Sequence, residues 1–257
     1  MMQFEDFAMN KDEPRVLIFT GAGVSAESGV PTFRNSPAGL WENFPVEKVC
    51  DIDNFEENYD LVHEFYNARR CALQDIEPNR AHLDIAFLQK QFGKNRVAIV
   101  TTNVDLLHEG AGATDVMHVH GRIDQMIMKY GSEDEYLMHL GYSEFDQAQW
   151  ILHDIEAKPA VVFFGEAMRY GHDGVKTDLY SEMQYLFNSM SSKDTIIVVG
   201  TSEVVVPVWT YVFNSPAHKI FIDPAGTENP EAYDVVLKEY ATTGVPAALE
   251  IAHTRMG

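Results

Sequence analysis

Five short apolar runs, separated by longer polar or amphipathic stretches, dominate the hydrophobic pattern of the chain. They are Val16–Thr20, Val97–Thr101, Ala160–Phe164, Thr195–Val199 and Lys219–Ile222. Each run is rich in Val, Ile or Phe and is followed by a glycine or a polar residue. Continuous apolar runs of this length, alternating with helical stretches, are typical of a parallel sheet that is covered on both faces. The pattern therefore predicts an α/β fold.

Two stretches between these runs, from about Ala38 to Arg80 and from Arg122 to Pro159, are too long for simple crossover connections. We expect them to pack together as a small lobe of about residues 38–80 and 122–158. A core of about residues 12–37, 81–121 and 159–257 would then form the rest of a single unit. No Pro/Ser-rich linker or repeat separates the two parts, so they should be closely joined.

A glycine-rich turn follows the first apolar run directly, with the sequence GAGVSAESG from Gly21 to Gly29. Gly21, Gly23 and Ala26 match the pattern G-x-G-x-x-A. In a Rossmann-like fold, glycine at these positions lets the backbone approach a pyrophosphate. An ordinary strand-to-helix turn is the alternative. Because ligands of such sheets bind beyond the carboxyl ends of the strands, the candidate chemistry should lie there.

The charge balance favours some partners over others. The chain has 19 Lys and Arg against 39 Asp and Glu, a net charge of −20 in 257 residues. A field of this sign repels phosphate backbones and attracts cationic partners such as lysine-rich protein segments. Nucleic acid is therefore not an expected partner.

Other features of the sequence bear on location. No apolar run approaches the length of a membrane span, and the first residues lack the pattern of a secretory signal. The two cysteines, Cys50 and Cys71, are too few for a disulfide framework. We expect a cytoplasmic protein that is a monomer and has no membrane partner.

Motifs in a fixed order extend the glycine turn across almost the whole chain. They are GAGVSAESGVPTFR and GLW between Gly21 and Trp41, TNVDLLH from Thr102 to His108, HVHG from His118 to Gly121, VVFFGE from Val161 to Glu166, and GTS from Gly200 to Ser202 with Pro207 after it. With these motifs the chain resembles the sirtuins, the NAD-dependent protein deacylases. The resemblance implies a sirtuin-like fold, a Rossmann-like domain with a smaller inserted lobe.

The resemblance also implies a mechanism and its catalytic residues. In the family, nicotinamide leaves the ribose of NAD and the acyl oxygen of a modified lysine takes its place. His120 would act as the general base toward a ribose hydroxyl, since an imidazole can accept a proton at neutral pH. Asn103 and Asp105 would stabilise the reacting ribose; a turn or helix cap is the alternative role for such a pair. The products would be free lysine, nicotinamide and O-acyl-ADP-ribose.

The remaining NAD contacts are likewise carried over from the family motifs. Asp223, where the family usually has Asn, would accept the adenosine ribose hydroxyls and favour NAD over NADP. The full set expected to bind NAD is Gly21, Ala22, Gly23, Ser25, Glu27, Phe33, Arg34, Thr102, Asn103, Val104, Asp105, His120, Gly200, Thr201, Ser202, Asp223 and Ala241.

A predicted amphipathic helix over Glu57–Ile76 bears on the acyl group. Its apolar face would carry Val62, Phe65, Tyr66, Ala72, Leu73 and Ile76. Arg69 lies inside this stripe, and a guanidinium there needs an anion or must extend to solvent. An internal salt bridge would meet this need.

The spacing of Tyr66 and Arg69 also resembles the Y-x-x-R motif of class III sirtuins, which clamps the carboxylate of succinyl-, malonyl- or glutaryl-lysine. Residues at i and i+3 reach one point from one helix face, and Arg binds carboxylates through paired hydrogen bonds. The resemblance therefore implies an acidic-acyl deacylase that also retains some activity on acetyl-lysine. The backbone of Val161 and Phe163 would pair with the substrate peptide.

The chain departs from the family pattern at three places. Residues 122–159 contain no cysteine, whereas sirtuins usually hold zinc there with four, and His139 and His153 lack paired spacing. We therefore expect no metal site and a lobe held by Met126, Ile127, Met128, Tyr136, Leu137 and Trp150. Thr102 replaces the usual glutamine, and Ala167–Arg169 replaces a stretch with proline.

Two alternative functions remain open on the sequence. The first is an NAD glycohydrolase or protein ADP-ribosyltransferase that uses the same pocket, which Thr102 and the altered lobe suggest. The second is a non-catalytic NAD-binding module, since fold does not fix function. His120, Asn103 and Asp105 argue against the second alternative.

Overall fold

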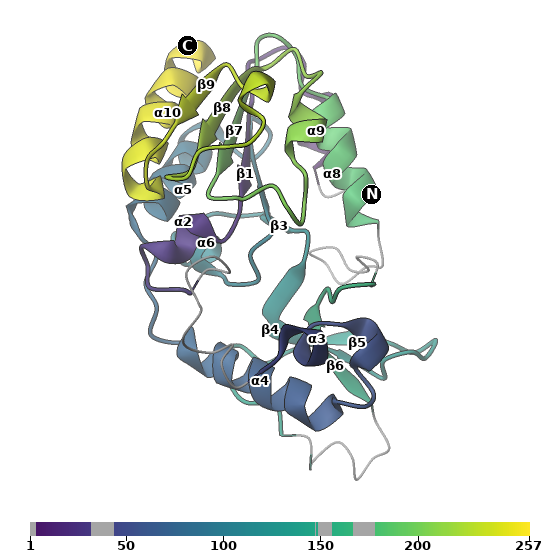
Figure 1. The fold of residues 1–257 in the computed structure, drawn as a ribbon. Coiled ribbons are helices and arrows are strands. Elements are labelled where there is room, and N and C mark those ends of the chain that lie inside the picture. Colours follow the sequence, from purple (N-terminus) through teal and green to yellow (C-terminus); the bar gives the residue numbers. More distant parts are fainter. Residues whose placement is uncertain (1–3, 32–43, 147, 149–155, 167–177) are drawn as a thin grey trace.

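A computed structural model describes residues 4–31, 44–146, 148, 156–166 and 178–257. Its centre is a parallel six-stranded sheet with the strand order β3-β2-β1-β7-β8-β9 (Figure 1). The strands are β1 (Val16–Thr20), β2 (Val97–Thr101), β3 (Met117–His118), β7 (Thr195–Val199), β8 (His218–Ile222) and β9 (Val235–Leu237). Strands β1, β2 and β7 are buried throughout, as expected for a sheet with two covered faces. The predicted α/β fold is confirmed.

Helices cover both faces of this sheet (Figure 1). Alternate residues of β1 point to opposite faces, so Leu17 and Phe19 belong to one apolar cluster and Val16 and Ile18 to another. The first cluster includes residues of α1 (Glu5–Met9), α8 (Leu179–Asn188) and α9 (Trp209–Val212). The second includes residues of α5 (Arg80–Phe92) and α10 (Ala241–Met256).

A second, antiparallel sheet lies apart from the first, in the order β5-β4-β6. It is formed by β4 (Gly121–Met128), β5 (Tyr136–His139) and β6 (Ala157–Val161). Against it lie α3 (Val46–Val49), a 3-10 turn η1 (Ile52–Asn54) and α4 (Tyr59–Ala72). Nearly all residues of these elements fall within the two stretches, about residues 38–80 and 122–158, that the sequence predicts for a small lobe.

One of the five predicted strands is placed wrongly by the sequence. Four runs become β1, β2, β7 and β8, but Ala160–Phe164 contributes only its first two residues to β6, which pairs antiparallel with β4. Val161 and Phe163 of this run lie in one cluster with Phe65 of α4, and Val162 packs against the cluster of the parallel sheet, so most of the run is apolar for reasons of packing. A covered strand of either sheet gives the same pattern.

The helix predicted over Glu57–Ile76 is shorter in the structure, because α4 begins at Tyr59 and ends at Ala72. Val62, Phe65, Tyr66 and Leu73 are buried as predicted. Ala72 is exposed, so its place on the apolar face was wrong. In the lobe, Met126, Ile127 and Met128 are buried, whereas Tyr136 is 43% exposed and Trp150 lies outside the described residues.

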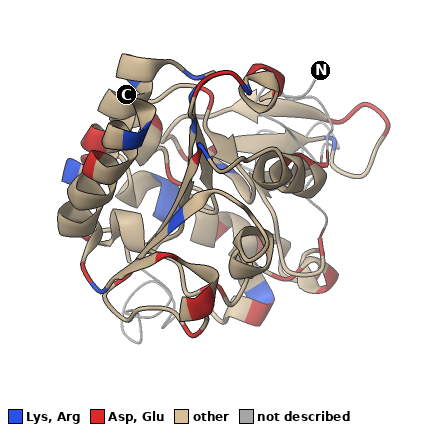
Figure 2. Ribbon diagram, turned by 90° about the horizontal axis from the view of Figure 1, so that it is seen from above, with Lys and Arg blue, Asp and Glu red and all other residues tan. Residues whose placement is uncertain are grey.

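Three short elements complete the described chain: α2 (Gly23–Ala26), α6 (Leu107–Gly110) and η2 (Pro230–Ala232). The described helices include none with the length and hydrophobicity that crossing a bilayer requires. Acidic residues are spread over several helices and loops rather than gathered on one element (Figure 2).

Candidate active site

The strand order of the parallel sheet identifies where a ligand should bind. The chain runs from β1 to β2 and β3 on one side and later to β7, β8 and β9 on the other, so the order reverses between β1 and β7. At such a point the loops after two strands separate and leave a crevice. The loops after β1, β2, β7 and β8 contain most of the residues that the sequence predicts to bind NAD.

The glycine turn lies at this switch point and contacts the turn after β7. Gly21 N donates to Val199 O at 2.9 Å, and Gly23 N donates to Gly200 O at 2.8 Å. A Cβ atom on Gly23 would lie 2.6 Å from Gly200 Cα, and one on Gly200 would lie 2.4 Å from Val24 N. Glycine is therefore needed here for the close approach of two backbone segments.

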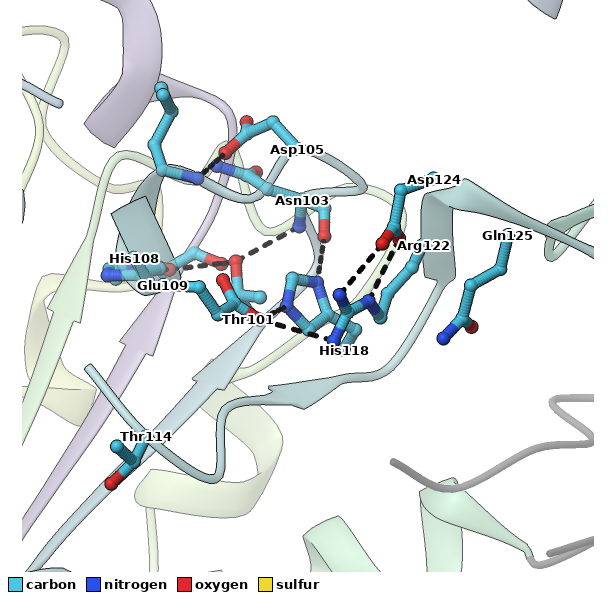
Figure 3. A network of polar contacts seen from close by, with 12 residues as sticks. Thr101, Asn103, Asp105, His108, Glu109, Thr114, His118, Arg122, Asp124 and Gln125 are labelled. Atoms are coloured by element: carbon cyan, nitrogen blue, oxygen red, sulfur yellow. Dashed lines mark hydrogen bonds and ion pairs between the residues drawn. The ribbon is translucent and has the colours of Figure 1, made fainter. Parts of the chain in front are cut away.

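Ser25, Asn103 and Asp105 form one buried polar cluster from two loops. The Ser25 hydroxyl donates to Asp105 Oδ2 at 3.0 Å and accepts from Asn103 Nδ2 at 3.1 Å. Asp105 Oδ1 accepts from Leu107 N at 3.1 Å (Figure 3). Burial raises the pKa of Asp105, while these hydrogen bonds favour the carboxylate. The structure thus brings together Ser25 of the glycine turn and two residues of the TNVDLLH motif.

A histidine that the sequence did not single out completes this cluster. His82 Nδ1 accepts from Asn79 N at 3.3 Å, so its Nε2 carries the proton and points at the Ser25 hydroxyl at 3.4 Å. Burial lowers the pKa of His82 to about 4 and keeps the ring neutral. Its sequence signal is weak, because a histidine three residues after Asn79 belongs to a helix-capping pattern.

His120 lies between the parallel sheet and the antiparallel sheet, and its ring has a defined tautomer. Nδ1 lies 3.2 Å from Thr102 O, and a carbonyl can only accept, so Nδ1 carries the proton. The lone pair of the neutral ring is then on Nε2. Burial lowers the pKa of His120, and the contact with Thr102 opposes this change. A neutral imidazole with a free Nε2 can act as a base.

The glycine after His120 is required by the neighbouring strand. Gly121 has φ of +78°, and a Cβ atom there would lie 2.0 Å from Ala160 O. The carbonyl of His120 itself accepts from Val162 N at 2.9 Å. These two contacts hold the backbone of the candidate base against the β6 segment, and Val119 N, one residue earlier, donates to Thr101 O of β2 at 2.9 Å.

Residues predicted for the adenosine side lie after β7 and β8. Thr201 Oγ1 accepts from Glu203 N at 3.0 Å, and Asp223 is buried and accepts from Ala225 N at 2.9 Å. Ala241 is buried at the start of α10. Ala22, Thr102 and Val104 are half-buried, whereas Ser202 is exposed.

Glu27 has a different environment from the other residues predicted to bind NAD. It is exposed, and its carboxylate accepts from Thr242 N at 2.9 Å and from Thr242 Oγ1 at 2.6 Å. An acidic group in this position stabilises the first turn of α10. Phe33 and Arg34 lie outside the described residues, as do Ala167–Arg169.

The predicted acyl-binding residue Tyr66 lies in an aromatic cluster. Its ring stacks on Phe163, with ring centres 5.6 Å apart and planes 13° apart. Its hydroxyl lies 3.5 Å from Cys50 Sγ. Phe163 follows Val162, whose N donates to His120 O. Tyr66 therefore packs against the residue next to one that contacts the candidate base. Burial raises the pKa of Tyr66, and the nearby charge of Arg69 acts against this rise.

The two arginines of α4 have different environments. Arg69 is half-buried, and its guanidinium lies over the Phe65 ring at 5.4 Å. Arg70 is fully buried and donates to Ile123 O at 2.8 Å and to Asn67 Oδ1 at 2.7 Å. Arg70 therefore ties α4 to β4, a role that the sequence analysis did not foresee.

A buried ion pair lies beside Val161 and Phe163, the two residues predicted to contact the substrate peptide. Lys158 Nζ lies 2.9 Å from Glu166 Oε2, and both side chains are almost fully buried. Lys158 Nζ also donates to Val161 O at 2.6 Å, and Phe163 N donates to Glu166 Oε2 at 3.1 Å. The backbone groups of Val161 and Phe163 thus have intramolecular partners. The sequence signal for this pair was a single lysine beside an apolar run.

Among the described residues, no group of three or more His, Cys, Asp or Glu side chains could hold a metal ion. His139 lies 3.5 Å from Asp124, while His153 lies outside the described part of the chain. Zinc content therefore stays a prediction for elemental analysis.

A parallel sheet with a glycine turn at its switch point and buried polar side chains beside it defines a dinucleotide-binding α/β protein. The donors and acceptors fit that ligand, because Asn103, Asp105 and Asp223 are buried at loop positions beyond the strand ends. Comparison with known proteins gives the family. The model of the Sir2 family matches residues 21–207. The chain belongs to the Sir2 family.

Relatives and solved structures agree with this assignment. The chain is 37% identical over 232 residues to an NAD-dependent protein deacylase of Escherichia coli strain K12, covering 86% of this chain and 77% of the relative. It is 35% identical over 246 residues to one of Rhodopirellula baltica, covering 91% and 97%. The crystal structure of a Sir2 homolog–NAD complex has a TM-score of 0.75 at 26% identity, covering 99% of this chain and 94% of that chain.

Proposed function

We propose that this protein is an NAD-dependent protein deacylase that removes acidic acyl groups, succinyl, malonyl or glutaryl, from lysine side chains. Membership in the Sir2 family, with relatives that carry the name NAD-dependent protein deacylase over most of the chain, supports the general activity. NAD is the co-substrate: the acyl oxygen of the modified lysine would replace nicotinamide on the ribose, and the acyl group would end as an ester on a hydroxyl oxygen of that ribose.

The observation that supports the general activity is the neutral ring of His120, which contacts the backbone of Thr102, the residue before Asn103. His120 Nδ1 is bound to Thr102 O, which orients the ring and leaves Nε2 to take a proton. Asn103 and Asp105 are held by Ser25 and by Leu107 N, so their polar atoms are fixed before substrate binds. Such preorganised groups stabilise positive charge that develops on a ribose.

The preference for acidic acyl groups rests on α4. Tyr66 and Arg69 are three residues apart on this helix, and Tyr66 stacks on Phe163 next to the strand that pairs with His120. The positive charge of Arg69 acts to lower the pKa of both Cys50 and Tyr66, although burial has the larger effect and raises both pKa values. A half-buried guanidinium and a tyrosine hydroxyl three residues apart on one helix are groups that suit a carboxylate.

The test compares matched succinyl-lysine and acetyl-lysine peptides by mass spectrometry, with and without NAD. Wild-type protein should convert the succinyl peptide with formation of O-succinyl-ADP-ribose. Arg69→Met should lower kcat/KM for the succinyl peptide about tenfold or more and leave the acetyl peptide unchanged, because a charged hydrogen bond is lost. Arg80→Met, an exposed arginine of α5, is the matched control.

The outcomes separate the proposal into its parts. Equal losses on both peptides in Arg69→Met would contradict the carboxylate clamp but not the deacylase chemistry. Consumption of NAD with neither peptide changed would favour an NAD glycohydrolase or an ADP-ribosyltransferase instead. That second candidate is favoured by Thr102, whose Oγ1 lies 3.4 Å from Thr20 O.

A further inference from the structure

The two histidines of the HVHG motif are two residues apart and have different hydrogen-bond partners. His120 contacts one acceptor through one nitrogen. His118, by contrast, has an acceptor at each ring nitrogen (Figure 3). Nδ1 lies 2.9 Å from Asn103 O, and Nε2 lies 2.7 Å from Glu109 Oε1.

The hydrogen-bond partners of His118 indicate which of its ring nitrogens carry protons. Asn103 O is a carbonyl and can only accept, so Nδ1 must carry a proton. Glu109 Oε1 also lies 3.6 Å from the guanidinium of Arg122, and a neighbouring cation favours the ionised carboxylate. The carboxylate accepts, so Nε2 must carry a proton as well.

The partners of His118 connect the two sheets. Glu109 belongs to α6 and Arg122 to β4, where Arg122 also binds Asp124 through two hydrogen bonds of 3.0 and 2.9 Å. The His118 side chain is only 4% exposed, so these contacts are shielded from solvent. A cationic ring there is compensated by a carboxylate and held in one orientation.

We propose that His118 is a positioning residue for the NAD chemistry: a doubly protonated imidazolium that holds the Asn103 carbonyl and stabilises the ionised form of Asp105. The proposal rests on the proposed function. Asn103 and Asp105 occupy one short turn after β2, so fixing the carbonyl of the first residue fixes the position of the second. His120 then stays neutral as a base while His118, two residues earlier, stays charged.

The charges around Asp105 make this role measurable. His118 lowers the pKa of Asp105, against the larger effect of burial, whereas Glu109 raises it. Burial raises the pKa of Tyr142, and the charge of Asp105 raises it further. Replacing His118 by a neutral residue leaves Glu109 uncompensated, so the pKa of Asp105 should rise further. Because Asp105 must be ionised to stabilise positive charge on the ribose, the part of the low-pH limb of kcat/KM that Asp105 sets should then move to higher pH.

The first experiment measures the charge directly. Nitrogen-15 NMR of the histidine-labelled wild-type protein at pH 7, without NAD, should show one histidine with protons on both ring nitrogens. Its signals should be missing in His118→Gln. If every histidine has an unprotonated ring nitrogen, the proposal is wrong. Because this measurement uses the wild-type protein, it is decisive even if variants fold poorly.

The second experiment measures the consequence for catalysis. His118→Gln should lower kcat/KM for NAD about tenfold, since a charged hydrogen bond is lost, and move the low-pH limb to higher pH. His118→Gln/Glu109→Gln removes both charges, so the limb should return toward its wild-type position. His218→Gln, which removes another histidine paired with a carboxylate at the opposite ends of the strands, should change neither quantity.

Two results would overturn the positioning role. In one, His118→Gln leaves the acid limb in place. In the other, the double variant keeps the shifted limb, which would make the effect steric rather than electrostatic. If wild-type protein deacylates no lysine peptide, the proposed function fails instead, and the NMR result still decides the charge of His118.

Discussion

The two halves of the candidate site are built from different interactions. On the side of the parallel sheet, Ser25, Asn103 and Asp105 are joined by hydrogen bonds of 3.0 to 3.1 Å in a buried cluster. On the side of the small sheet, Tyr66 is held mainly by ring packing on Phe163. Hydrogen bonds fix atoms to fractions of an ångström, while stacked rings tolerate sliding. The polar half therefore suits invariant chemistry, and the aromatic half suits a variable acyl group.

The largest expected effect comes from a substitution that disables the polar half alone. His120→Ala should lower deacylation on the order of a thousandfold for any acyl peptide, because the general base is lost while the aromatic half is intact. Steady-state release of nicotinamide in the presence of peptide measures this loss. The exposed His253→Gln serves as control. A variant that kept most of its turnover would show that another group takes the proton.

The next effect concerns stability on the small-sheet side. Lys158→Met leaves Glu166 buried without its cation and should lower the free energy of unfolding by about 3 kcal/mol or more. Lys158→Met/Glu166→Gln should recover much of this loss, since no charge then remains unpaired. Denaturant unfolding followed by circular dichroism measures both. Equal stability of the single and double variants would contradict an ion pair with this role.

The smallest expected effect is a pH dependence of the free energy of unfolding, to which buried histidines on both sides contribute. Burial lowers the pKa of His63 to about 4 and of His108 to about 3, below the value near 6.5 in an unfolded chain. Between these values the unfolded chain binds more protons, so stability is full above about pH 6.5 and falls as the pH decreases. Each histidine should contribute about 1.4 kcal/mol per pH unit.

His63→Phe separates the two halves in this measurement. The ring of His63 lies among Tyr59 and Phe145, so phenylalanine fits its surroundings, although the contact with Ala157 O is lost. Thermal unfolding between pH 7 and 5 should then show a shallower slope than in the wild-type protein. An unchanged slope would mean that His63 does not titrate on unfolding.

The sequence predicted the parallel sheet better than the small one for a physical reason. β1, β2 and β7 have the predicted residues because a strand covered on both faces must be apolar throughout. The same rule misplaced Ala160–Phe164, since α4 covers β6 as helices cover the parallel strands. Periodicity reports burial and cannot tell which sheet a strand joins.

For the site, the motifs predicted Ser25, Asn103, Asp105 and His120, and the structure brings them to one end of one sheet. They did not predict partners such as His82, Glu109 or Lys158. Such residues act through contacts between distant segments, as where Lys158 reaches Glu166, and no local pattern records those distances. Nor could a pattern separate the buried Arg70 from the half-buried Arg69.

The contact at Gly121 limits how this protein can change its sequence and keep its activity. With the Ala160 carbonyl 2.0 Å from where a Cβ would be, every side chain at position 121 would push β6 away from the histidine before it. By contrast, α4 meets β6 through side chains, whose substitution leaves that backbone in place. Substitutions on the face of α4 can therefore change side-chain contacts without moving β6, while position 121 accepts only glycine.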